Sequence, residues 1–161
     1  MRKAFTLIEL LLVFGIMIAL GAIVFANLGG KRTSADVAAT GQEVATVLRR
    51  AQTDAVEQEN GVVQGVSVSW GVHFANVTGT APFYALFAGT YSPTTTVGYY
   101  PLPSTVSYQT STLAAGATLD VIFSPITGVT PTATVISFYM PKENAAFSST
   151  ISVATSGAVS Y

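Results

Sequence analysis

Glu9 is the residue of this 161-residue chain whose setting points most clearly to chemistry, because it lies within a long apolar run. The run begins at Phe5, and from Leu10 to Ala26 it contains no charged residue. A charged side chain inside such a helix costs about 3 kcal/mol when the helix lies in lipid. A buried charge is tolerated when it is paired, so we expect the Glu9 carboxylate to have a charged partner.

The other reactive side chains do not form a catalytic pattern. His73 is the one histidine of the chain, and after Glu59 the acidic residues are Asp120 and Glu143. A Ser-His-Asp triad would have to bring His73 and Asp120 together by chance, since no Gly-x-Ser-x-Gly turn is present. Two isolated carboxylates disfavour a glycosidase pair or a calcium site, and the absence of cysteine excludes thiolate chemistry. We therefore expect a non-enzymatic protein with no catalytic residues, metal or cofactor, in which His73 is structural or lies on the surface.

The element that must position Glu9 is an apolar helix. In lipid a helix is favoured because its backbone amides and carbonyls bond to one another. From Phe5 to Leu28 a helix would cover about 36 Å at ~1.5 Å per residue, enough for a ~30 Å hydrocarbon core. The sequence therefore predicts a transmembrane helix over residues 5–28. An ordinary secretory signal ending near Ala26 is the rival interpretation, but its apolar region would be longer than the ~7–15 residues typical of such signals. A plain membrane anchor is a further alternative.

The start of the chain resembles the class III signal of type IV pilins and pseudopilins. The matching residues are Phe5-Thr6-Leu7-Ile8-Glu9, the apolar residues after them and the short basic segment Met1-Arg2-Lys3-Ala4. The resemblance implies that a prepilin peptidase cuts between Ala4 and Phe5 and methylates the new amine of Phe5. The family usually has glycine before the cut, where this chain has Ala4. Glu9 would then pair with the methylated amine of its own or a neighbouring subunit.

The resemblance also implies partners and a location. The partners are other pilin or pseudopilin subunits, the prepilin peptidase and an inner-membrane assembly platform. The implied location is the bacterial inner membrane, crossed once, with a cytoplasmic N-terminus and a periplasmic or extracellular head, and later the filament. The helix residues implied in assembly are Phe5, Leu7, Ile8, Glu9, Leu10, Leu11, Leu12 and Val13.

Residues 29–60 predict an amphipathic second half of the same helix. Val37, Val44 and Ala51 recur every seven residues, which places them on one face of a helix. A row of charged residues faces away from much of this stripe: Asp36, Glu43, Arg50 and Glu57. Arg50 of this row is also spaced to meet Asp54, one helical turn further on. Glu59-Asn60-Gly61 predicts the end of the helix, because Asn and Gly suit a left-handed cap.

Residues 61–161 predict an antiparallel β-rich head. Only 9% of the whole chain is charged, and this part is rich in Val, Thr, Ser and Gly, which suits strands joined by tight turns. Alternation from Val62 to Phe74 places Trp70, Val72 and Phe74 on one face. The other predicted strands are residues 83–87, 97–100, 106–109, 119–123, 134–140 and 149–154.

Several segments of the second half resemble the GspH/FimT-like minor pseudopilins. They are the Leu-Arg-Arg-Ala-Gln sequence at 48–52, the segment 121–128 and the segment 151–159. The predicted fold class is therefore α+β, in which a long N-terminal helical spine with a transmembrane first half packs against an antiparallel β head. The predicted organisation is a leader at 1–4, a filament-core helix at 5–28, the rest of the spine at 29–60 and the head at 61–161.

The predicted function is that of a structural subunit, a minor pilin or pseudopilin, of a type IV pilus or a type II secretion pseudopilus. One alternative is a DNA-binding minor pilin, but the segment 155–161 is uncharged and the net charge is −1, so we do not expect nucleic acid as a partner. Another alternative is an anchored or secreted β-domain that binds a surface or a carbohydrate.

Overall fold

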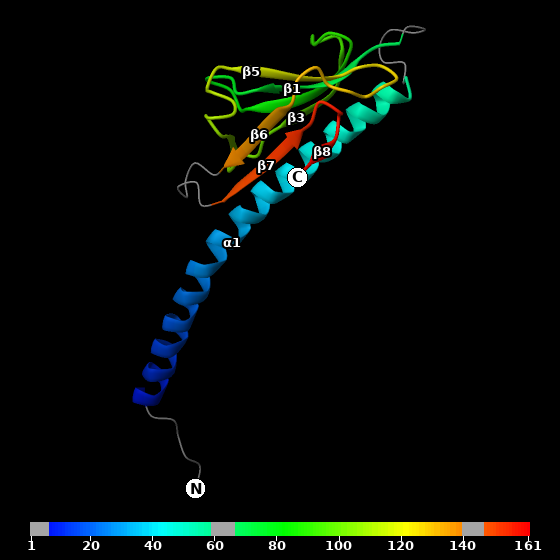
Figure 1. Ribbon diagram of the computed structural model, residues 1–161. Coiled ribbons are helices and arrows are strands. Elements are labelled where there is room, and N and C mark those ends of the chain that lie inside the picture. The colour runs from blue at the N-terminus through cyan, green and yellow to red at the C-terminus, as the bar shows by residue number, and fades with distance from the viewer. Residues whose placement is uncertain (1–6, 59–66, 140–146) are drawn as a thin grey trace. The chain divides into compact units, whose positions relative to one another are not determined.

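The computed structural model of the chain describes residues 7–58, 67–139 and 147–161, and for residues 23–34 it describes the backbone alone (Figure 1). Helix α1 (Leu7–Val56) comes first, and the strands of the described residues follow it. These strands form two antiparallel sheets, so the chain is α+β. The strands are β1 (Trp70–Ala75), β2 (Phe83–Ala88), β3 (Thr96–Pro101), β4 (Ser107–Tyr108), β5 (Thr118–Phe123), β6 (Thr134–Tyr139), β7 (Ser148–Val153) and β8 (Val159–Ser160).

The predicted transmembrane first half of the spine is wrong. Within the described residues, no helix combines the length and the apolar character that crossing a membrane requires. The fold class is therefore corrected to α+β without a transmembrane spine. The predicted single-pass inner-membrane location is wrong on the same finding.

The chain divides into two compact units, Met1–Ala35 and Asp36–Tyr161. The part of α1 that begins at Asp36 belongs to the second unit, together with all the strands. Its apolar stripe is buried, as the seven-residue repeat predicts: Val37, Val44 and Ala51 are at most 2% exposed. The predicted contact of Arg50 with Asp54 is also present, with Arg50 Nε 3.5 Å from Asp54 Oδ2.

Helix α1 ends earlier than its sequence predicts. Its last residue is Val56, and Gln58 adopts a left-handed conformation with φ of 55°. A left-handed residue just beyond the last turn is a common way to end a helix, although Gly or Asn usually holds that place. The predicted cap at Glu59-Asn60-Gly61 lies outside the described residues.

Two four-stranded sheets form the rest of the second unit. Sheet A has the strand order β3-β2-β1-β5, and sheet B has the order β4-β6-β7-β8. The predicted alternation in β1 is confirmed from Trp70 onward, since Trp70, Val72 and Phe74 all belong to one buried core cluster. That cluster also contains side chains from α1 and both sheets, among them Leu48, Tyr108, Phe123 and Phe138.

Sheet B lies close against α1, and Figure 1 shows β7 alongside the helix. A Cβ added at Gly41 of α1 would overlap the Ser149 hydroxyl and the Tyr161 ring, so a larger residue there would require both side chains to move. Two hydrogen bonds add to the contact: the Tyr161 hydroxyl donates to the Ala38 carbonyl at 3.0 Å, and Arg49 Nη2 donates to the Val159 carbonyl at 3.3 Å. Strand β8, which the sequence did not predict, therefore pairs with β7 and also bonds to the helix through Arg49.

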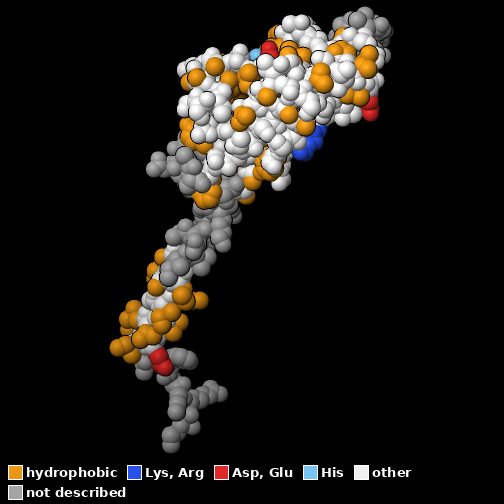
Figure 2. All heavy atoms as spheres, viewed as in Figure 1, with side chains coloured by type: hydrophobic (Ala, Val, Ile, Leu, Met, Phe, Trp, Pro, Cys, Tyr) orange, Lys and Arg blue, Asp and Glu red, His pale blue; other side chains and the backbone are white. Residues whose placement is uncertain are grey.

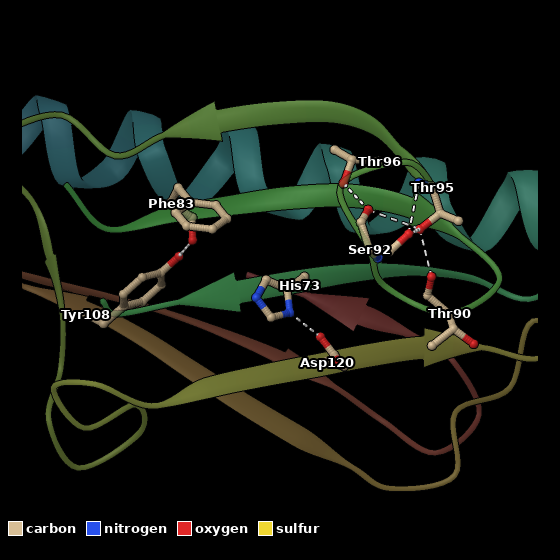
Figure 3. Close-up of polar contacts among 8 residues, drawn as sticks. All are labelled: His73, Phe83, Thr90, Ser92, Thr95, Thr96, Tyr108 and Asp120. Carbon is tan, nitrogen blue, oxygen red and sulfur yellow. Dashed lines mark hydrogen bonds and ion pairs between the residues drawn. The ribbon is translucent and has the colours of Figure 1, made fainter. Parts of the chain in front are cut away.

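The buried phenol of Tyr108 predicts a loss of stability at alkaline pH. Tyr108 is 1% exposed, and its hydroxyl donates to the Phe83 carbonyl at 2.8 Å (Figure 3). Burial, and then the nearby Tyr84 phenol, raise the pKa of Tyr108 above its ordinary value. The folded chain therefore keeps this proton at a pH where the unfolded chain, with a tyrosine pKa of about 10, loses it.

The contribution of the Tyr108 phenol to the free energy of unfolding should therefore be constant below about pH 10. It should decrease as the pH rises further. Tyr108→Phe should cost about 1 kcal/mol at neutral pH, where the hydrogen bond is lost, and should make the alkaline fall shallower. Urea unfolding at neutral and alkaline pH measures both effects. An alkaline fall of the same slope in the Phe variant would contradict the assignment.

Candidate functional site

The first candidate site is an apolar surface on the N-terminal part of α1. Its large side chains are between 52% and 79% exposed, and Figure 2 shows apolar side chains gathered along this part of the helix. A helix segment that is apolar on all sides is normally covered, and exposed apolar patches of this kind mark interaction sites. We call it the N-terminal apolar surface, and it consists of Leu7, Ile8, Leu10, Leu11, Leu12, Val13, Phe14, Ile16, Met17, Ile18 and Leu20.

Glu9 lies within this surface, in the first turn of α1. The unpaired backbone N–H groups of a first helical turn give it partial positive charge, which stabilises a carboxylate there by about 0.3–1 kcal/mol. Glu9 lies beside Leu10, Val13, Phe14 and Met17 along one side of the helix. A polar group and exposed apolar side chains therefore share one face of the helix.

The structure describes most of the residues predicted for processing and assembly. Ala4 and Phe5, between which the cut is predicted, lie outside the described residues. The other predicted assembly residues are on α1, and each of the apolar ones is exposed: Leu7, Ile8, Leu10, Leu11, Leu12 and Val13. Phe14, Ile16, Met17, Ile18 and Leu20 continue the same uncharged run and belong to the helix predicted to form the filament core.

The second candidate site lies on the outer face of sheet A, where His73 and Asp120 meet. They are register partners on the adjacent strands β1 and β5, and His73 Nδ1 is 2.5 Å from Asp120 Oδ1 (Figure 3). The His73 ring is buried at 6% exposure, whereas the Asp120 side chain is 42% exposed. This contact was not predicted from the sequence, because the pairing of two strands whose residues lie 47 positions apart is not visible in the local sequence pattern.

This pair lacks the third member of a catalytic triad in the part of the chain that is described. There, no serine or threonine hydroxyl bonds to the His73 ring. The hydroxyl cluster drawn in Figure 3 bonds within its own loop: the Thr95 hydroxyl donates to the Thr90 carbonyl at 2.7 Å, and the Ser92 amide donates to the Thr95 hydroxyl at 2.8 Å. Nor do the described residues contain a cluster of three or more His, Asp or Glu suited to a metal ion.

Aromatic rings cover the outer face of sheet A around His73. Tyr91 stacks on the His73 ring with centroids 3.6 Å apart and an interplanar angle of 5°, and Phe83 lies 4.7 Å from Tyr99. Phe87 meets Tyr91 edge-on at 5.6 Å. We call Phe83, Phe87, Tyr91 and Tyr99 the outer aromatic layer.

Small residues on the central strands make room for this layer. Ala85 and Ala75 carry only a methyl group, and a Cβ added at Gly71 would lie 2.7 Å from both the Phe87 ring and the Val121 carbonyl oxygen. The predicted strands supplied these residues, but Tyr91 comes from the loop between β2 and β3. Its position over His73 has no signal in the sequence.

Comparison with known proteins gave no match: no family model, no curated protein and no solved structure corresponds to the chain.

Proposed function

We propose that this chain is a non-enzymatic filament subunit, similar to a pilin or pseudopilin, that assembles through the N-terminal apolar surface after processing between Ala4 and Phe5. The observation that carries the proposal is the exposure of that surface, from 52% to 79% along α1. The second unit encloses a buried core of its own. The N-terminal apolar surface is thus the part of the described chain that most needs a partner.

Burial supplies the energy for assembly in this proposal. Each large apolar side chain that a neighbouring subunit covers completely contributes about 1.5–3 kcal/mol. Only part of this appears as affinity, because association also costs translational and side-chain entropy. Contacts along several turns of α1 nevertheless provide more favourable free energy than association costs. Identical helices from many subunits present the same apolar surface to one another.

Glu9 sets the alignment of neighbouring helices in this proposal. Once a neighbour covers the surface, the carboxylate would be buried among apolar side chains and would require a cation. The new amine of Phe5, on the same or an adjacent subunit, is the cation that processing creates. A single polar group in an apolar seam is a known means of fixing register, because any other alignment leaves it unpaired.

Glu9→Ala should therefore lower incorporation into filaments severalfold without changing the stability of the second unit. The matched control is Glu57→Ala, which removes an exposed carboxylate just beyond the end of α1. The measurement is the amount of each variant in sheared filaments relative to the amount in whole cells, by immunoblot. Normal incorporation of the Ala variant would remove the proposed role of Glu9.

Mass spectrometry of the mature N-terminus tests the processing step separately. The expected species begins with N-methylated Phe5. A mature start at Asn27 would identify the apolar run as a secretory signal and would overturn the proposal, because the N-terminal apolar surface would then be removed.

A further inference from the structure

The outer face of sheet A carries a straight row of groups that the proposed filament contact does not use. Tyr99 of β3, Ala85 of β2, His73 of β1 and Asp120 of β5 are register partners in turn across the four strands. Neighbouring strands are about 4.8 Å apart, so the row is about 14 Å long. Its two ends are open, since Tyr99 is 58% exposed and the Asp120 side chain is 42% exposed.

Asp120 is a positioned acceptor rather than a freely rotating surface acid. His73 Nδ1 holds its Oδ1 at 2.5 Å, and the stacked ring of Tyr91 holds the imidazole in turn. Within the described residues, this is the one hydrogen bond or ion pair of the Asp120 side chain. Its second carboxylate oxygen can therefore accept a hydrogen bond from a ligand.

The middle of the row is covered, since Ala85 is 1% and His73 6% exposed, so aromatic rings form the surface between its two ends. Phe83 and Tyr99 lie 4.7 Å apart, and both are at least partly exposed. Burial raises the pKa of the Tyr91 phenol, and the nearby Asp120 carboxylate and Tyr99 phenol raise it further. The row therefore combines aromatic rings with the Asp120 carboxylate at one end.

We propose that this row binds a carbohydrate chain, with one sugar ring on Tyr99 and Phe83 and sugar hydroxyls donating to Asp120. A sugar ring has an apolar face of C–H groups and a polar rim of hydroxyls, which matches aromatic rings beside a fixed carboxylate. Ligand sites commonly combine aromatic side chains with a few placed polar groups in this way.

Charge selects among the possible ligands. Asp120 is the one Asp, Glu, Lys or Arg that the structure describes from residue 67 onward. With no described Lys or Arg beside it, the carboxylate repels phosphate, nucleic acid and acidic sugars. The proposed ligand is therefore a neutral or amino-bearing oligosaccharide, long enough to lie along a row of about 14 Å.

Isothermal titration calorimetry with the full chain tests the proposal, in a polyoxyethylene detergent that has no sugar headgroup. The probes are neutral β-1,4-linked hexamers of glucose and of N-acetylglucosamine, the cationic hexamer of glucosamine and an anionic hexamer of galacturonic acid. Saturable binding of at least one of the first three is expected, with none for the anionic probe. Tyr99→Ala should weaken the binding by about tenfold, the scale of one lost aromatic contact, and Asp120→Asn should weaken it as well.

Tyr161→Ala is the matched control, because Tyr161 is 51% exposed and lies beside α1 instead of on sheet A. It should leave sugar binding unchanged, and circular dichroism shows that each variant is folded. The proposal is overturned if none of the first three probes binds, or if binding is the same in the Tyr99 and Asp120 variants. Binding of a lysine-rich peptide without any sugar binding would identify a protein-docking surface instead.

Discussion

Gly157→Ala should lower the free energy of unfolding by at least about 3 kcal/mol, the largest single effect that we expect from so small a change. Gly157 has φ of 85°, a conformation that residues with a Cβ rarely adopt. The added Cβ would overlap the Gly128 carbonyl oxygen and would lie 2.5 Å from Gln52 Nε2. The backbone cannot move away easily, because Gln52 Nε2 donates to that same carbonyl at 3.4 Å and Gly157 is buried.

Gly79→Ala is the matched control, because it introduces the same backbone strain without a steric overlap. Gly79 has nearly the same φ, 88°, but no atom lies within 4 Å of an added Cβ. It should therefore cost only the strain of a left-handed conformation, about 1–2 kcal/mol. Urea unfolding followed by Trp70 fluorescence suits both variants, because Trp70 is the single tryptophan and is 3% exposed. Equal losses in the two variants would contradict the close approach at Gly157.

Leu48→Ala and Leu11→Ala form the second pair, and they should affect different properties. Leu48 is fully buried in the core cluster, so its truncation should cost about 2–5 kcal/mol of stability. Leu11 is 62% exposed on the N-terminal apolar surface, so its truncation should change stability by less than about 0.5 kcal/mol. Under the proposed function, Leu11→Ala should instead lower the amount of protein found in sheared filaments.

The two measurements needed are urea unfolding and the filament immunoblot described for Glu9. A large loss of stability in Leu11→Ala would show that this side chain packs within its own subunit. Normal filament incorporation of Leu11→Ala, together with Leu12→Ala and Ile16→Ala, would remove the N-terminal apolar surface from the assembly proposal.

Local periodicity was sufficient to predict much of the second unit. The seven-residue repeat at Val37, Val44 and Ala51 located the buried stripe of α1, and alternation located the core face of β1. Most other predicted strands are present within one or two residues of their predicted ends. These features depend on contacts between a residue and its own helix or strand, which the sequence displays directly.

Features that depend on distant pairing could not be predicted in this way. The contact of His73 with Asp120 requires the β1–β5 register, and the stack of Tyr91 on His73 requires the path of a loop. Strand β8 is two residues long, too short for alternation to mark it. The transmembrane prediction was wrong for another reason. It assumed an apolar helix over residues 5–28, whereas within the described residues no helix combines the length and the apolar character that crossing a membrane requires.

The close contact of α1 with β7 and β8 affects how the protein folds during its synthesis on the ribosome. The helix is synthesised first, but Gly41, Ala38 and Arg49 meet partners that lie after residue 147. At about 5–20 residues per second, roughly 5–20 s of translation separate the two. During that interval the side of α1 that later meets β7 and β8 lacks its native contacts, so a chaperone that holds nascent chains could bind there.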